Sequence, residues 1–252
     1  MTRLAGKRAL MTGAGGLLGS DLCRAFAADG ADMVLTTRTE AKLAPLAEEL
    51  RGMGAKVATV AADFTCNDDV DRLAGEAWEA FGGIDVVLLS SQPPEPNLGS
   101  LLETTDEDWQ DQFSSIVWGP MRLMRQLAPR MMEAGGGSVI TFTSSTGSDP
   151  IEGYAAYGLA KAGLWALSLY MAREWGAGGI RVNALQPGLI ATGDDADYEA
   201  RQLSASRHGV LARTSLARLG RNRECIGAAV YLASDESSFT SGQRIAVDGG
   251  RF

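Results

Sequence analysis

Ser144, Tyr157 and Lys161 have the residue types and spacing of a proton-transfer site. Tyr157 and Lys161 are four residues apart, so on a helix they share one face, one turn from each other. An ammonium group beside a phenol favours the phenolate, and the spacing therefore predicts that Lys161 lowers the pKa of Tyr157 from about 10. Tyr157 could then exchange a proton with an alcohol or carbonyl oxygen, to which Ser144 could donate a second hydrogen bond. The simpler interpretation is a surface lysine that extends past a packed tyrosine.

Such a proton-transfer site needs a hydride partner, and the glycine-rich segment Thr12–Gly19 predicts where that partner binds. The segment follows a short apolar run and precedes an amphipathic one. Glycines there allow a tight turn and let the backbone approach a pyrophosphate, which faces the free N–H groups and positive dipole of the following helix. The candidate contacts in this segment are Gly13, Gly15, Gly16, Leu18 and Gly19.

The end of the second expected strand indicates which dinucleotide binds. An acidic residue there would accept a hydrogen bond from the ribose 2′-hydroxyl of NAD, whereas a cation favours the 2′-phosphate of NADP. The strand ends in Thr37 and Arg38, and a guanidinium can bind phosphate through two parallel hydrogen bonds. We therefore expect NADP(H) rather than NAD(H), although Arg38 could also be a solvated strand-end arginine. Asp63, which Phe64 follows, could accept from the adenine amino group or could simply hold a turn.

Short apolar runs alternate with longer amphipathic ones along the chain, which predicts parallel strands connected by helices. The expected strands are 8–12, 33–37, 56–61, 86–90, 139–143, 181–186 and 244–247. The expected helices are 18–28, 40–53, 67–81, 106–133, 155–176 and 223–233. This pattern predicts a single α/β domain over residues 1–252, a doubly wound Rossmann fold with helices on both faces of its sheet. Residues 189–217 show no clear period and are predicted to form a substrate lid, with a surface loop containing one helix as the alternative.

The net charge and the residue composition exclude several classes of binding partner and metal site. The net charge of −8 argues against nucleic acid and anionic membranes, and no apolar stretch is long enough to span a bilayer. The N-terminus has no apolar signal core. Three scattered cysteines suggest reduced thiols in a cytoplasmic protein. The single histidine, His208, makes a His-rich metal site or a Ser-His-Asp triad improbable, so no metal is expected.

Further short motifs recur in a characteristic order. They are Asp63, Ile84-Asp85, Asp108-Trp109, Arg181-Val182-Asn183, Pro187-Gly188 with Thr192, and Ser241-Gly242-Gln243 with Val247-Asp248-Gly249-Gly250. With Thr12–Gly19, Ser144 and Tyr157-x-x-x-Lys161, these motifs make the chain resemble the short-chain dehydrogenase/reductase family, in its single-domain branch of about this length.

The resemblance implies a role for each motif. It implies a sheet of about seven strands, Tyr157 as general acid/base, and Ser144 as the residue that holds the substrate oxygen. It implies that Lys161 holds the nicotinamide ribose and lowers the pKa of Tyr157. It also implies that the segment 187–192 holds the nicotinamide carboxamide. The candidates in that segment are Pro187, Gly188, Ile190 and Thr192.

Three positions depart from the family's pattern. The glycine spacing resembles that of the family's longer branch, which includes sugar-nucleotide epimerases, because Leu17 replaces a glycine. The family's Asn-Asn-Ala-Gly is replaced by Leu89-Ser90-Ser91-Gln92, from which Ser90 or Ser91 could still reach the ribose. Ile116 occupies the position of a catalytic asparagine that helps to hold a water in a proton relay. The relay is either rebuilt, for example through Ser115 or Ser114, or slower.

We therefore expect hydride transfer between NADP(H) and a small or alicyclic ketone or alcohol. Residues 92–95, 146–154, Trp118 and the lid would shape the substrate pocket, although Trp118 could instead serve helix packing. The alternatives are an enzyme similar to 3-oxoacyl-carrier-protein reductases and a nucleotide-sensing homologue with weakened catalysis. The expected helices 106–133 and 155–176 are apolar on more than one face and pair across subunits in similar proteins, which predicts a homotetramer.

Overall fold

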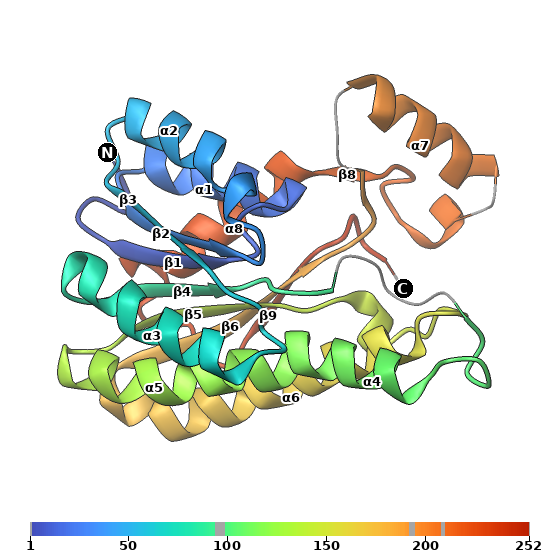
Figure 1. Ribbon diagram of the computed structural model, residues 1–252. Helices are drawn as coiled ribbons and strands as arrows, with labels where there is room; N and C mark the ends of the chain where they lie inside the picture. The colour runs from blue at the N-terminus through green and yellow to red at the C-terminus, as the bar shows by residue number, and fades with distance from the viewer. Residues whose placement is uncertain (1, 94–98, 192–194, 208–209, 252) are drawn as a thin grey trace.

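The computed structural model describes residues 2–93, 99–191, 195–207 and 210–251, and its centre is a parallel sheet of seven strands (Figure 1). The strands are β1 (Arg8–Thr12), β2 (Asp32–Thr37), β3 (Val57–Ala61), β4 (Val86–Leu89), β5 (Gly137–Phe142), β6 (Ile180–Pro187) and β9 (Arg244–Val247). Their order in the sheet is β3-β2-β1-β4-β5-β6-β9. The order reverses beside β1, which pairs with both β2 and β4, so a crevice is expected at the carboxyl ends of these strands.

Helices cover both faces of the sheet, as Figure 1 shows. One face carries α1 (Leu17–Ala28), α2 (Ala44–Gly52) and α8 (Asn222–Ala233), and the other carries α3 (Asn67–Phe81), α5 (Gly119–Glu133) and α6 (Ala155–Trp175). The strands read as apolar runs because both of their faces are buried, as in β4, where all four residues are buried. The predicted doubly wound Rossmann fold is therefore confirmed.

Local sequence explains where several helices begin and end. In α3 the buried residues Val70, Leu73, Ala74 and Ala77 follow the spacing of one helical face, and the helix ends at Gly82 in the left-handed conformation. At the other end of the same layer, α4 (Asp106–Phe113) begins at Thr105 with a reciprocal capping box to Asp108.

The predicted helices differ from the observed ones at two places. The expected helix 40–53 is a 3₁₀ turn at Glu40–Lys42 followed by α2, because Pro45 favours a helix start. The expected helix 106–133 consists of α4, a π-helical turn at Ser114–Trp118, and α5.

The stretch 189–217 contains a helix, which only the surface-loop alternative included, and a short strand that its sequence did not indicate. Ile190–Ala191 (β7) pairs with Gly220–Arg221 (β8) in a small separate sheet, and Asp195–Arg207 forms α7. Most side chains of α7 whose exposure is described are solvent-exposed, so no apolar stripe marks this helix in the sequence. No helix in the described ranges is both long and apolar enough to cross a bilayer.

Gly13 and Gly82 form a matched pair for testing the turn after β1. Both have a positive φ, +71° and +67°, and a Cβ at Gly13 would lie 2.8 Å from the Ser90 carbonyl oxygen, whereas a Cβ at Gly82 would meet nothing within 4 Å. Alanine at either site costs about 1 kcal/mol of backbone strain, and the clash adds to it only at Gly13. We expect Gly13→Ala to lower the free energy of unfolding by about 2 kcal/mol more than Gly82→Ala in urea titrations. Equal losses would show that the loop yields to the added methyl group.

Candidate active site

A cavity of about 620 Å³ follows the carboxyl ends of the strands, from the loop after β1 to the end of β6. It brings together nearly all of the site residues predicted from the sequence. They are Gly13, Gly15, Gly16, Leu18, Gly19, Thr37, Arg38, Asp63, Phe64, Ser90, Ser91, Ser144, Tyr157, Lys161, Pro187, Gly188 and Ile190. Thr192 lies outside the described residues. Segments far apart in the sequence thus share one cavity, as expected for the switch point of a doubly wound sheet.

Five of the described lining residues were missed in the sequence: Ala62, Phe142, Thr143, Lys42 and Asn222, of which the last two have charged or amide side chains. Lys42 lies in the 3₁₀ turn after β2, four residues beyond Arg38, and its proximity to Arg38 was an available signal. Asn222, at the start of α8, donates to Asp21 Oδ2 at 2.8 Å, and its own buried Oδ1 has no hydrogen-bond partner. Only the packing of α8 against α1 brings Asn222 to this cavity, so no local pattern could have indicated it.

The glycines of the loop after β1 line the cavity with backbone atoms and no side chains. A Cβ at Gly19 would lie 2.3 Å from the Gly13 carbonyl oxygen, and one at Gly15 would lie 3.3 Å from Thr37 Cγ2. Helix α1 begins at Leu17 after Gly16, which provides no side-chain cap. The first N–H groups of α1 therefore remain available to an anion, and the loop fits the pyrophosphate of a dinucleotide.

Asp63 also has a structural role. Its Oδ1 accepts hydrogen bonds from the Thr65 amide at 2.9 Å and from the Thr65 hydroxyl at 2.8 Å. This is the turn-holding alternative considered for the aspartate in the sequence. Asp63 nevertheless lines the cavity beside the largely buried Phe64.

Ser144 follows the end of β5 and is oriented by Thr146. The Ser144 Oγ accepts from the Thr146 hydroxyl at 2.9 Å and from the Thr146 amide at 3.3 Å. Because these bonds occupy acceptor positions of the oxygen, the Ser144 proton is free to point elsewhere. Ser144 can therefore donate a hydrogen bond within the cavity that it lines.

Lys161 is buried, and its Nζ donates to the Phe142 carbonyl at 2.7 Å and lies 5.5 Å from the centroid of the Tyr157 ring. Burial lowers the pKa of Lys161 to about 7. The shared helix face predicted from the sequence is therefore present, but the lysine is not a solvated surface cation.

The pKa of Tyr157 differs from the prediction. Burial raises this pKa, the Tyr154 side chain raises it further, and a hydrogen bond with Ser144 acts in the opposite direction. The expected lowering by Lys161 was wrong for the protein alone, because desolvation penalises the phenolate and the ammonium of Lys161 is itself penalised by burial. Tyr157 in this environment holds its proton at neutral pH.

The expected substrate pocket is formed only in part. Gln92 and Pro93 line the cavity, whereas Pro94 and Glu95 lie outside the described residues. Trp118 is 62% exposed and does not line the cavity, nor does any residue of 146–154 among those described. In the described ranges, no cluster of three or more His, Cys, Asp or Glu side chains could hold a metal ion.

The buried Lys161 has a consequence for stability. Its pKa is about 7 in the native state and near 10.5 in a solvated chain, so between these values the unfolded state binds more protons and the free energy of unfolding rises with pH. Below pH 7 the lysine is charged in both states and the full desolvation cost is present. The raised pKa of Tyr157 opposes this trend only above about pH 10.

We compare the free energies of unfolding of the wild type and of Lys161→Met in urea titrations. The difference, wild type minus variant, should increase by about 3 kcal/mol between pH 7 and 9.5. Lys56, whose side chain is 78% exposed, provides the control, because Lys56→Met removes a lysine without the burial. A difference for Lys161→Met that does not change with pH would contradict the assigned environment.

The chain is similar to known proteins in sequence and in overall structure. A family model described as enoyl-(acyl carrier protein) reductase matches residues 13–251. An uncharacterized oxidoreductase of Mycobacterium tuberculosis is 38% identical, over 99% of this chain and 94% of its own length. The L-tagatose-forming galactitol 2-dehydrogenase of Cereibacter sphaeroides is 34% identical, over 98% of this chain and 96% of its own.

A solved structure agrees with these sequence matches. A 7α-hydroxysteroid dehydrogenase complexed with NADH and 7-oxo glycochenodeoxycholic acid superposes with a TM-score of 0.89 at 28% identity, covering 99% of this chain and 96% of that one. These relatives support an oxidoreductase that uses a nicotinamide cofactor, and they confirm the resemblance drawn from the motifs. The chain belongs to the short-chain dehydrogenase/reductase family.

Proposed function

We propose that this protein transfers a hydride between NADP(H) and a ketone or secondary alcohol. The observation that carries the proposal is one continuous cavity with a bare glycine loop and two basic side chains toward one end and Ser144, Tyr157 and Lys161 toward the other. A nicotinamide bound there would accept or supply the hydride.

Each part of a dinucleotide has candidate partners along the cavity. Asp63 and Phe64 would contact the adenine, and the loop after β1 the pyrophosphate. Ser90, Tyr157 and Lys161 are the candidates for the nicotinamide ribose, whereas the hydroxyl of Ser91, the other candidate from the sequence, donates to the Ser115 carbonyl. Pro187, Gly188, Ile190 and Thr192 are the candidates for the nicotinamide itself.

The side chains of the site suggest a division of labour during reduction. Ser144 and Tyr157 hydrogen-bond the substrate oxygen, and Tyr157 transfers its proton to that oxygen as negative charge develops on it. The protonated form of Lys161 stabilises the resulting phenolate. Because burial raises the pKa of Tyr157, the phenol is present as a proton donor at neutral pH, whereas the reverse reaction needs the phenolate and is favoured by higher pH.

Replacement of Tyr157 tests this assignment. We expect Tyr157→Phe to reduce turnover of a carbonyl substrate at least a thousandfold, because the proton donor is lost, while NADPH binding measured by fluorescence changes by less than threefold. Tyr231→Phe is the matched control, since it removes a hydroxyl whose partner is Thr240, outside the cavity. Near-normal turnover by Tyr157→Phe would refute the proposed function.

The preference for NADP(H) rests on the end of β2. Arg38 and Lys42 are exposed and line the cavity, and a Cβ at Gly15 would lie 3.4 Å from Lys42 Cβ. Two cations there would bind the 2′-phosphate, and β2 ends in Thr37 rather than in the acid that accepts from a 2′-hydroxyl. The NADH in the complex of the 7α-hydroxysteroid dehydrogenase describes that protein only.

Substitution of the two cations tests the cofactor preference. We expect Arg38→Ala and Lys42→Ala each to weaken NADP⁺ binding about tenfold or more in calorimetry and to leave NAD⁺ binding within twofold. Lys56→Ala, at the opposite end of the sheet, should change neither affinity. Equal affinity of the wild type for NAD⁺ and NADP⁺ would contradict the preference.

The cavity lining includes uncharged residues such as Gln92, Pro93 and Phe142, which supports an uncharged substrate. We expect a compact, uncharged or alicyclic ketone or alcohol, tested with a panel of diketones, quinones and cyclic ketones. An acidic acyl-carrier protein would be repelled by a chain with a net charge of −8, which disfavours the carrier-protein alternative despite the description of the family model. NADPH binding without oxidation across the whole panel would favour the nucleotide-sensing alternative.

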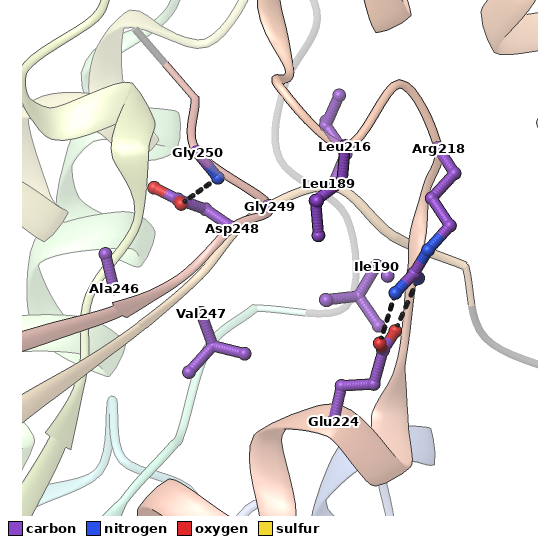
Figure 2. A pocket seen from close by; sticks show the side chains of 11 residues that line it. Leu189, Ile190, Leu216, Arg218, Glu224, Ala246, Val247, Asp248, Gly249 and Gly250 are labelled. Carbon is purple, nitrogen blue, oxygen red and sulfur yellow. Dashed lines mark hydrogen bonds and ion pairs between the residues drawn. The ribbon is translucent and has the colours of Figure 1, made fainter.

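The stretch 189–217 is the proposed lid of a single catalytic domain spanning residues 1–252. One ion pair holds the lid, and a second lies just beyond its end. Arg213 of the lid pairs at 2.8 Å with Asp149, which lies in the loop that follows Ser144. Arg218, just beyond the lid, pairs with Glu224 of α8. Figure 2 shows the Arg218–Glu224 pair beside Ile190, on the rim of a second cavity of about 230 Å³. Ile190 lines both cavities, so motion of the lid would change the shape of the cavity where the nicotinamide is proposed to bind.

The oligomeric state and the compartment complete the proposal. Trp118 and, on α6, Leu159, Leu169 and Tyr170 are exposed apolar side chains, which supports a homotetramer through these helices that light scattering can test. The free cysteines at 23, 66 and 225 suit a reducing compartment such as the cytoplasm.

A further inference from the structure

The turn Ser114–Trp118 between α4 and α5 has π geometry, in which the Gly119 amide donates to the Ser114 carbonyl five residues earlier. A π turn contains one residue more than an α turn, and a carbonyl within it loses its usual helical donor. A buried carbonyl without a donor is destabilising, so the turn needs a partner from elsewhere in the fold.

Ser91 supplies that partner. Its hydroxyl donates to the Ser115 carbonyl at 2.9 Å. The backbone of Ser91 is held in turn by Thr12 at the end of β1, whose Oγ1 accepts from the amides of Ser90 at 2.8 Å and Ser91 at 3.0 Å. A chain of hydroxyl contacts thus connects β1, the loop after β4 and the π turn.

The register of this turn decides which side chains reach the site. Ser115 is only 7% exposed and lines the cavity that Tyr157 and Lys161 also line. Ile116 is fully buried in a small apolar cluster with Ala160, against which Tyr157 packs. Removing the extra residue of the π turn would rotate the preceding residues by about 100° relative to those that follow, and both placements would be lost.

We propose that Ser91 is a positioning residue whose hydroxyl holds the π turn, so that Ser115 presents its hydroxyl to the cavity and Ile116 seals the buried side of Tyr157. Ser91 and Ser115 together would then replace the side-chain amide that the family's pattern has at position 116. The effect on turnover rests on the proposed function, whereas the effect on the turn does not.

Hydrogen exchange and kinetics of Ser91→Ala test the proposal. We expect the Gly119 amide to exchange at least fivefold faster and kcat to fall about tenfold, with a shifted pH profile of kcat and an NADPH dissociation constant within twofold of wild type. Ser91→Thr, which retains the hydroxyl, should restore the exchange rate and kcat. Ser138→Ala is the matched control, because it removes a buried serine hydroxyl that donates to the Leu232 carbonyl at 2.7 Å, away from the cavity.

A double substitution separates positioning from general destabilisation. If Ser91 acts through Ser115, adding Ser91→Ala to Ser115→Ala should lower kcat by less than twofold further. Independent, multiplying effects would overturn the proposal, as would an unchanged Gly119 exchange rate combined with weakened NADPH binding, which would make Ser91 a cofactor contact. A wild-type protein inactive on every substrate would refute the proposed function, and the exchange rate of Gly119 in Ser91→Ala would still decide whether Ser91 holds the turn.

Discussion

The hydrogen bond from the Lys161 ammonium group to the Phe142 carbonyl is the contact on which the candidate site depends. It joins α6 to the carboxyl end of β5, two residues before Ser144, and so brings the serine and Tyr157 to the same wall of the cavity. A buried ammonium group is tolerated only where such a partner exists, because desolvation disfavours its charge. The burial that lowers the pKa of Lys161 to about 7 also raises the pKa of Tyr157. The acid/base properties of the pair therefore follow from the surrounding core as much as from their spacing on one helix.

The parallel sheet provides the frame for this contact. All seven strands run in one direction, so their carboxyl ends meet at one edge, and the reversal of strand order beside β1 opens that edge to a ligand. The uncapped start of α1 and the bare glycine loop face the same space. The glycine loop, where we propose that phosphates bind, and the buried Tyr157–Lys161 pair are thereby parts of one cavity.

The apolar side of Tyr157 distinguishes this chain within its family's pattern. Ile116 packs in the cluster beneath the ring, and the neighbouring backbone is held by a serine hydroxyl from the loop after β4. Two departures that look unrelated in the sequence, at positions 91 and 116, thus meet at one turn of the structure. Such coupling is expected where a π turn lies beside a functional site, since its unpaired carbonyl must be satisfied by whatever the neighbouring loop offers.

The sequence by itself determined the sheet, the family and most of the residues that line the cavity. Continuous apolar runs indicate the strands that are buried on both faces, and the spacing of apolar residues indicates helices such as α3. Thr12–Gly19 and Tyr157-x-x-x-Lys161 are local motifs that can be recognised without the structure. The tertiary structure decided the pKa directions of Tyr157 and Lys161, the presence of Asn222 at the cavity, the π turn and the exposed helix α7. These depend on desolvation and on contacts between segments up to about two hundred residues apart, such as the bond of Asn222 to Asp21, and no spacing within one segment records them.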